Sequence, residues 1–194
     1  IAVAGTHGKT TTTGMLAKVL KDAGASPTAV VGSIVKDFGS NYLYGDSELF
    51  VVEACEYKDH LLELSPTILV ITNLEWDHTD YFTSLTSLQE TFKKAIEHVP
   101  TDGIIVTDPK NPNITPLLAH AKARVVDYTK EPSYNLRLPG EFNVMNARAA
   151  AVGSGDDGYA LVDAGFSGDP LSAVPAMPVN SPQPWLYVGD RNKT

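Results

Sequence analysis

Hydrophobic and polar residues follow two patterns that alternate along the chain. Short apolar runs bounded by turn residues are separated by stretches in which apolar residues recur with helical spacing. We predict strands near residues 1–4, 28–32, 49–53, 67–72, 102–106 and 123–127, and helices near 9–23, 57–64, 84–98, 112–121 and 143–152. This alternation indicates an α/β fold with a mostly parallel sheet flanked by helices. A turn-rich alternating stretch at 33–48 suggests a hairpin attached to the sheet.

The composition changes after about residue 152. Residues 153–194 contain 6 glycines and 5 prolines, which is more than twice the frequency in the first 152 residues. Five prolines between Pro170 and Pro184 leave little room for a regular helix. We therefore predict one domain over 1–152 and an irregular C-terminal extension of unknown role over 153–194.

Charge and composition narrow the class of protein. Fifteen basic and 23 acidic residues give a formal net charge of −8, which argues against a general nucleic-acid binder because that class needs a basic surface. No apolar run approaches the roughly 18 residues of a membrane-spanning helix. The single cysteine, Cys55, fits a reducing compartment, so we expect a cytoplasmic protein without membrane insertion.

A glycine-containing loop follows the first predicted strand. Residues 5–8 read Gly-Thr-His-Gly. Lys9 follows them, and Thr10 is the first of four consecutive threonines at the start of the next predicted helix. Glycines let the backbone approach a phosphate, and the N–H groups at the start of the helix face the anion. Lys9 supplies a positive charge, and the Thr10 hydroxyl is suited to Mg²⁺. The order of strand, loop and helix predicts a P-loop NTPase-like phosphate site.

Polar side chains end two later strands. Glu53 follows the apolar run at 49–52, and Asn73 follows the run at 68–71. Because ligands bind at the carboxyl ends of strands in open parallel sheets, we expect both side chains beside the phosphate loop. Glu53 is then a candidate magnesium ligand, and His78, in the acidic segment 75–80, is a candidate for a further metal ligand or a phosphate contact.

Four segments in the same order carry a family resemblance. Residues 4–11, 52–57, 72–80 and 139–147 resemble the motifs of the central ATPase domain of the Mur ligases, and the resemblance covers 1–152. It is strongest to the branch that joins L-alanine to UDP-N-acetylmuramic acid. The family arrangement implies an N-terminal UDP-sugar domain and a C-terminal Rossmann-like domain, both of which we expect to be absent from this sequence.

The resemblance also implies roles for individual residues, with ATP and Mg²⁺ as cofactors. The implied catalytic residues are Lys9, Glu53 and His78, and the implied metal ligands are Thr10, Glu53 and His78. Asn143 and Asn146 match asparagines associated with adenine recognition. The whole implied nucleotide-binding set is Gly5, Thr6, His7, Gly8, Lys9, Thr10, Thr11, Asn73, Asn143 and Asn146.

The implied reaction is ATP-dependent amide formation through an acyl phosphate, in peptidoglycan biosynthesis. We expect this chain by itself to lack ligase activity, because sugar and amine recognition lie mostly in the other domains. Two departures from the family pattern are Cys55, where this branch usually has Asp, and Phe142, which replaces a histidine. A murein-peptide recycling ligase of the same family and a nucleotide-binding module without ligase activity stay open as alternatives.

Overall fold

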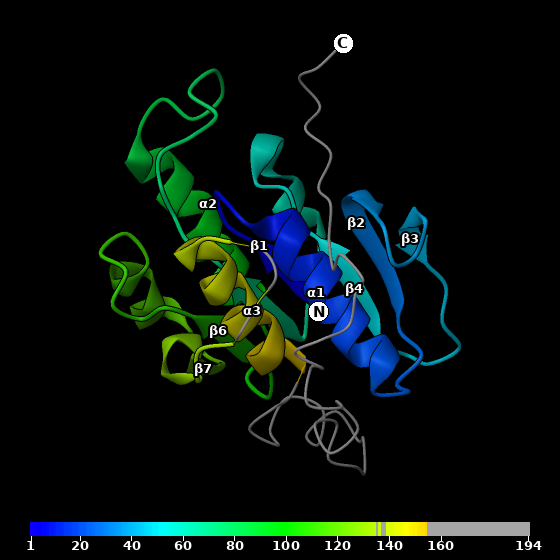
Figure 1. Ribbon diagram of the computed structural model, residues 1–194. Coiled ribbons are helices and arrows are strands. Elements are labelled where there is room, and N and C mark those ends of the chain that lie inside the picture. Colours follow the sequence, from blue (N-terminus) through cyan, green and yellow to red (C-terminus); the bar gives the residue numbers. More distant parts are fainter. Residues whose placement is uncertain (135, 137–138, 155–194) are drawn as a thin grey trace.

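The computed structural model describes residues 1–134, 136 and 139–154 of the chain. Its strands are β1 (Ala2–Ala4), β2 (Thr28–Val35), β3 (Ser40–Leu43), β4 (Phe50–Glu53), β5 (Ile68–Ile71), β6 (Ile104–Thr107) and β7 (Arg124–Asp127). Its α-helices are α1 (Lys9–Asp22), α2 (Leu85–His98) and α3 (Glu141–Ser154). Three 3₁₀ helices, η1 (Tyr57–Glu63), η2 (Thr115–His120) and η3 (Tyr128–Lys130), complete the elements shown in Figure 1.

The strands form one sheet in the order β3-β2-β4-β1-β5-β6-β7. Every pairing is parallel except the antiparallel pairing of β2 with β3. Strands β2, β3 and β4 lie on one side of β1, with β4 next to it, and β5, β6 and β7 follow in order on the other side, so the strand order reverses beside β1. A reversal of this kind leaves a crevice at the carboxyl ends of the strands. The predicted mostly parallel α/β sheet is confirmed.

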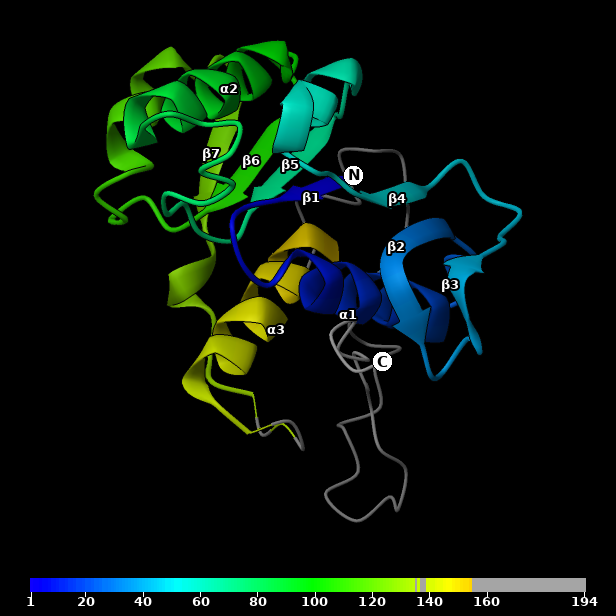
Figure 2. The same ribbon diagram turned by 90° about the horizontal axis from the view of Figure 1, so that it is seen from above.

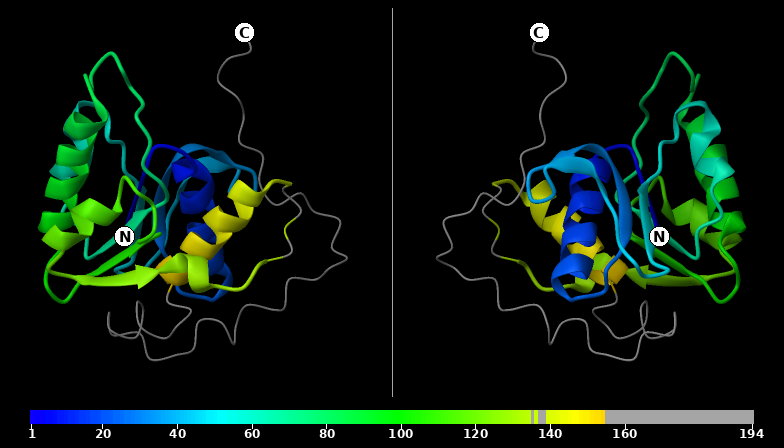
Figure 3. Two further views of the ribbon diagram at one scale, coloured as in Figure 1. Left: turned by 90° about the vertical axis from the view of Figure 1, so that its left-hand side faces the viewer. Right: turned by 90° about the vertical axis from the view of Figure 1, so that its right-hand side faces the viewer.

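The two faces of the sheet carry separate hydrophobic cores. On one face, Leu69 of β5 packs with Phe92 of α2 and with residues of η1 and η2. On the other face, Val3 of β1 packs with Leu16 of α1 and Ala150 of α3. Figures 2 and 3 show the resulting three layers, with α1 and α3 side by side across the sheet from α2. Burial on both faces explains why the central strands are apolar throughout.

The structure differs from the sequence prediction in the kind and extent of some elements. An antiparallel hairpin is present, but its first strand is β2, which begins at Thr28, so most of that strand precedes the predicted stretch 33–48. Its second strand, β3, lies within that stretch. The helices predicted at 57–64 and 112–121 are short 3₁₀ helices, and the first contains left-handed backbone at Lys58 and Asp59. Helix α3 begins at Glu141 and includes Gly153 and Ser154, beyond the expected end at 152. The rest of the predicted extension, 155–194, lies outside the described residues.

No helix in the described part of the chain has the length and apolar character needed to cross a membrane.

Candidate functional site

The phosphate loop lies in the crevice and leads from β1 directly into α1. Gly8 caps the helix with left-handed backbone (φ 82°), and no side chain of the described residues caps the N-terminus of α1. The first turn of α1 also contains no acidic residue. The first N–H groups of a helix have no partners within it. This helix end is therefore suited to an anion, as the sequence predicted.

The segment after β5 fixes the shape of the loop. The Asn73 side chain forms two hydrogen bonds with the His7 backbone: its Nδ2 donates to the His7 carbonyl, and its Oδ1 accepts from the His7 N–H, each at 2.9 Å. The Thr72 hydroxyl donates to the same carbonyl at 2.7 Å, and the Thr6 hydroxyl donates to the Glu75 carbonyl at 2.8 Å. The Asn73 amide thus shapes the loop, and Asn73 also lines the neighbouring pocket, so its implied part in nucleotide binding stays a prediction.

Lys9 and His78 meet at a carboxylate that the sequence prediction did not single out. Lys9 Nζ donates to Glu56 Oε1 at 2.9 Å, and His78 Nε2 lies 3.4 Å from the same oxygen. The Glu56 side chain is only 1% exposed. His78 has left-handed backbone (φ 50°), and its ring lies 5.1 Å from the ring of Tyr57. Two implied catalytic residues are therefore brought together, with Glu56 between them.

Thr10 and Glu53 form the second polar pair at the loop. Thr10 Oγ1 donates to Glu53 Oε1 at 2.9 Å, and the Gly32 backbone N–H donates to Glu53 Oε2 at 2.5 Å. No three His, Cys, Asp or Glu side chains gather into a metal-binding group within the described ranges. Mg²⁺ is commonly held by one or two protein oxygens together with substrate phosphates and water. The hydroxyl oxygen of Thr10 and the carboxylate oxygen of Glu53 therefore fit Mg²⁺ as ligands.

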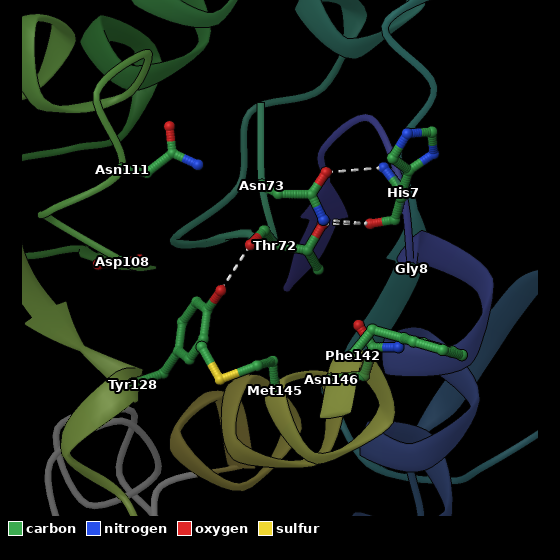
Figure 4. Close-up of a pocket in the computed structure, with 10 residues that line it drawn as sticks. All are labelled: His7, Gly8, Thr72, Asn73, Asp108, Asn111, Tyr128, Phe142, Met145 and Asn146. Carbon is green, nitrogen blue, oxygen red and sulfur yellow. Dashed lines mark hydrogen bonds between the residues drawn. The ribbon is translucent and has the colours of Figure 1, made fainter. Parts of the chain in front are cut away.

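A pocket of about 440 Å³ adjoins the phosphate loop, between α3 and the segments that follow β5 and β6 (Figure 4). Phe142, Met145 and Asn146 line it from α3, while Asp108 and Asn111 lie across from them. Its full lining is His7, Gly8, Thr72, Asn73, Asp108, Asn111, Tyr128, Phe142, Met145 and Asn146. The pocket is large enough for a nucleoside.

The two asparagines of the fourth motif lie on α3 and are nearly buried. Asn143 Nδ2 donates to the Pro139 carbonyl at 2.8 Å, and Asn146 lines the pocket. Phe142 is 67% exposed at the pocket, so its ring is available for stacking. Cys55 is exposed, and the site carboxylates come from Glu53 and Glu56 on either side of it.

Tyr128 lines the pocket. Replacing it by phenylalanine is expected to lower the free energy of unfolding by about 1–3 kcal/mol. Its hydroxyl, in a side chain that is 3% exposed, donates to the Thr72 carbonyl at 2.5 Å. Burial, with smaller contributions from Asp108 and Asp127, raises the pKa of Tyr128 to about 12. Urea denaturation of both proteins at neutral pH measures the difference.

The same variant changes how stability depends on pH. The unfolded chain releases the phenol proton near pH 10, so the stability from a raised folded-state pKa is complete below pH 10 and is lost as the pH rises through about 12. Tyr128→Phe should therefore flatten the decline between pH 10 and 12. An unchanged decline would contradict this assignment.

Comparison with known families identifies the chain. A profile described as the Mur ligase middle domain matches residues 3–134, which is more than half of the sequence. The chain belongs to the Mur ligase family. Its phosphate loop, Glu53 and His78 all fall within the matched residues, whereas α3 with Asn143 and Asn146 lies beyond them.

Curated Mur ligases extend the match. The chain is 42% identical over 179 residues to the UDP-N-acetylmuramate–L-alanine ligase of Caldicellulosiruptor bescii, covering 77% of this chain and 39% of that protein. It is 43% identical over 129 residues to the enzyme of the same name from Caldicellulosiruptor saccharolyticus, covering 66% of this chain and 28% of that protein. The chain thus spans about two fifths or less of the length of these relatives.

Solved Mur ligase structures share the fold. The UDP-N-acetylmuramate-alanine ligase of Thermotoga maritima matches with a TM-score of 0.66 and 29% identity, over 89% of this chain and 43% of that one. The UDP-N-acetylmuramate:L-alanyl-gamma-D-glutamyl-meso-diaminopimelate ligase of Neisseria meningitides matches with a TM-score of 0.74 and 25% identity, over 94% of this chain and 67% of that one.

Sequence reasoning missed several residues of the candidate site. Glu56 stands three positions after Glu53, just past the same strand, and its spacing alone does not reveal that it is buried. Asp108 directly follows β6, as Glu53 ends β4, so the rule that places ligands at strand ends would have found it. Tyr128 and Met145 reach the pocket from η3 and α3, and no sequence signal marks them.

Proposed function

We propose that this chain is the ATP-binding core of a ligase that joins L-alanine to UDP-N-acetylmuramic acid. The observation that carries the proposal is the meeting of Lys9, Thr10, Glu53 and His78 around one uncapped helix N-terminus, at the carboxyl edge of the sheet. The names of the curated relatives support the choice of amino acid and sugar. A cytoplasmic location is proposed with it, supported by the single cysteine.

In the proposed reaction, the lactyl carboxylate of the sugar attacks the γ-phosphate of ATP, the bond to the β-phosphate breaks, and ADP leaves. The amino group of alanine then attacks the carbonyl carbon of the acyl phosphate, and phosphate and a proton are released as the amide forms. Phosphoryl transfer depends on positioning and on neutralising negative charge. The first-turn N–H groups of α1 would bind the phosphates, and Lys9 would neutralise the outer ones. Asn73 would hold His7 so that the loop keeps its shape, and Phe142 would stack on the base.

Mg²⁺ fits the proposed site through Thr10 Oγ1 and Glu53 Oε1, which lie 2.9 Å apart. His78 is proposed as a ligand of a second metal or a contact of the reacting phosphoryl group. When bound, the metal would neutralise negative charge where the lactyl carboxylate meets the γ-phosphate. The Gly32 N–H donates to the other carboxylate oxygen, Glu53 Oε2, and so holds the Glu53 side chain in place.

Calorimetric titration with Mg²⁺ and a non-hydrolysable ATP analogue tests the proposal. The wild-type chain should bind saturably, Lys9→Met should bind at least about tenfold more weakly, and Glu53→Gln should lose the Mg²⁺ dependence. Lys122→Met, which removes the same charge at an exposed position, is the matched control and should bind normally. Circular dichroism confirms that each variant is folded at the temperature used. Absence of binding by the folded wild-type chain would refute a preformed nucleotide site.

Ligase activity is proposed for the protein of full family length, since this chain spans about two fifths of its relatives. The test supplies the flanking domains of a relative and measures phosphate release. Release that requires both UDP-N-acetylmuramic acid and L-alanine would support the proposed ligase activity. Release driven instead by a preformed peptide would favour the recycling ligase. Nucleotide binding without release under either condition would favour a binding module.

A further inference from the structure

The Lys9 ammonium group uses its whole hydrogen-bonding capacity within the protein. Its Nζ donates to the Gly5 carbonyl at 2.6 Å, to the Thr6 carbonyl at 3.1 Å and to Glu56 Oε1 at 2.9 Å. An ammonium group has three donors and no acceptor. In this geometry no donor is left for a phosphate, so a phosphate can bind Lys9 only by replacing one of these three partners.

Glu56 is the partner that a phosphate most resembles. It is the charged one of the three, and the two carbonyls belong to the loop itself. Its side chain is 1% exposed, while that of Lys9 is 14% exposed. Glu56 Oε2 is buried and has no hydrogen-bond partner among the residues that the structure describes. Because a buried carboxylate is costly without a counter-charge, Lys9 is held to Glu56 as its neutralising partner.

We propose that Glu56 is a positioning residue that keeps Lys9 folded into the phosphate loop until the outer phosphates of a nucleotide replace it. The inference rests on the proposed nucleotide site, and it adds that the Glu56 carboxylate competes with the phosphates for Lys9. The ligand class is a nucleoside di- or triphosphate, since the role inferred for Lys9 concerns the outer phosphates. Affinity for these phosphates is therefore set partly by the energy needed to separate Lys9 from Glu56.

Glu56→Gln tests the competition, because glutamine keeps the shape of the side chain and one acceptor oxygen but removes the charge. Charge-assisted hydrogen bonds are about twice as strong as neutral ones, so the variant should bind ATP analogue and ADP on the order of tenfold more tightly. Its affinity for AMP should be unchanged. Glu75→Gln is the matched control: Glu75 is an exposed carboxylate 3.8 Å from His7, and its loss removes the same charge from the rim of the loop.

A double-mutant cycle separates competition for Lys9 from a general electrostatic effect. In a Lys9→Met background, Glu56→Gln should give no gain in affinity, because the residue for which it competes is absent. An equal gain with and without Lys9, or an equal gain from Glu75→Gln, would show that Glu56 acts only as one more negative charge. Unchanged or weaker binding by folded Glu56→Gln would overturn the proposal.

Chemical labelling of Lys9 tests the contact without any nucleotide. Brief treatment with acetic anhydride, followed by mass spectrometry of the peptides, should modify Lys9 more slowly than exposed Lys122 in the wild-type chain. Glu56→Gln should raise the Lys9 rate several-fold and leave the Lys122 rate unchanged. Equal Lys9 rates in both proteins would refute the inference. If the labelling difference were observed but the folded wild-type chain bound no nucleotide, the contact between Lys9 and Glu56 would stand and the proposed function would be refuted.

Discussion

Lys9→Met is expected to lower the free energy of unfolding by about 3–5 kcal/mol with no nucleotide in solution. A phosphate-loop lysine is usually regarded as a ligand contact whose removal leaves the fold intact. Here its removal takes the ammonium partner from the Glu56 carboxylate, which is 1% exposed. His78 Nε2 stays 3.4 Å from one carboxylate oxygen, and the other oxygen has no hydrogen-bond partner in the described part of the chain. Urea denaturation in nucleotide-free buffer measures the loss.

A double variant tests whether the loss of stability comes from the buried charge of Glu56. Lys9→Met/Glu56→Gln should recover most of the stability, because the buried charge is removed together with its partner. Lys122→Met, at an exposed position, should stay within about 0.5 kcal/mol of wild type. A single variant as stable as wild type, or a double variant no more stable than the single one, would contradict the prediction.

Gly5→Ala is expected to cost about 3 kcal/mol or more. Gly5 has φ 129°, which side chains rarely adopt, and a Cβ there would overlap Thr72 Oγ1 and lie 2.9 Å from the Asn73 carbonyl oxygen. Backbone strain contributes about 1–3 kcal/mol. Displacing the Thr72 hydroxyl from the Ala4 and His7 carbonyls adds a loss of similar size. Thermal and urea denaturation provide the measurement.

Gly24 offers a control for the strain alone. It also has positive φ (79°), but a Cβ there would meet no atom within 4 Å. Gly24→Ala should therefore cost only about 1 kcal/mol. If the two alanine variants lost equal stability, backbone conformation alone would explain both, and close packing of the loop against β5 would have no measurable effect.

The strands and their parallel arrangement could be predicted from sequence because each buried strand is an apolar run with turn residues around it. Thr10 and Glu53 were predicted to come together by the rule that strand ends share one edge of the sheet, and they form a hydrogen bond. The 3₁₀ form of η1 could not be predicted. Left-handed backbone at Lys58 and Asp59 depends on tertiary contacts, including the hydrogen bond from Thr91 to the Asp59 carboxylate.

The role of Glu56 was beyond sequence reasoning for a related reason. Glu53 and Glu56 are chemically identical side chains three residues apart, and a pattern cannot say which one is buried. Their difference arises from the turn after β4, which directs one carboxylate to Thr10 and Gly32 and the other to Lys9 and His78. Burial of a charge is decided by packing across the loop and not by its local sequence.

The contact between Gly8 and Asn146 fixes the spacing between the phosphate loop and α3. A Cβ at Gly8 would overlap Asn146 Oδ1, so the helix rests directly on the backbone of the loop. Asn146 is the sixth residue of α3, and Ala150 and Val152 further along the same helix are buried in the core shared with α1. Asn146 also lines the pocket, so direct atomic contact sets the distance from the phosphate loop to the pocket.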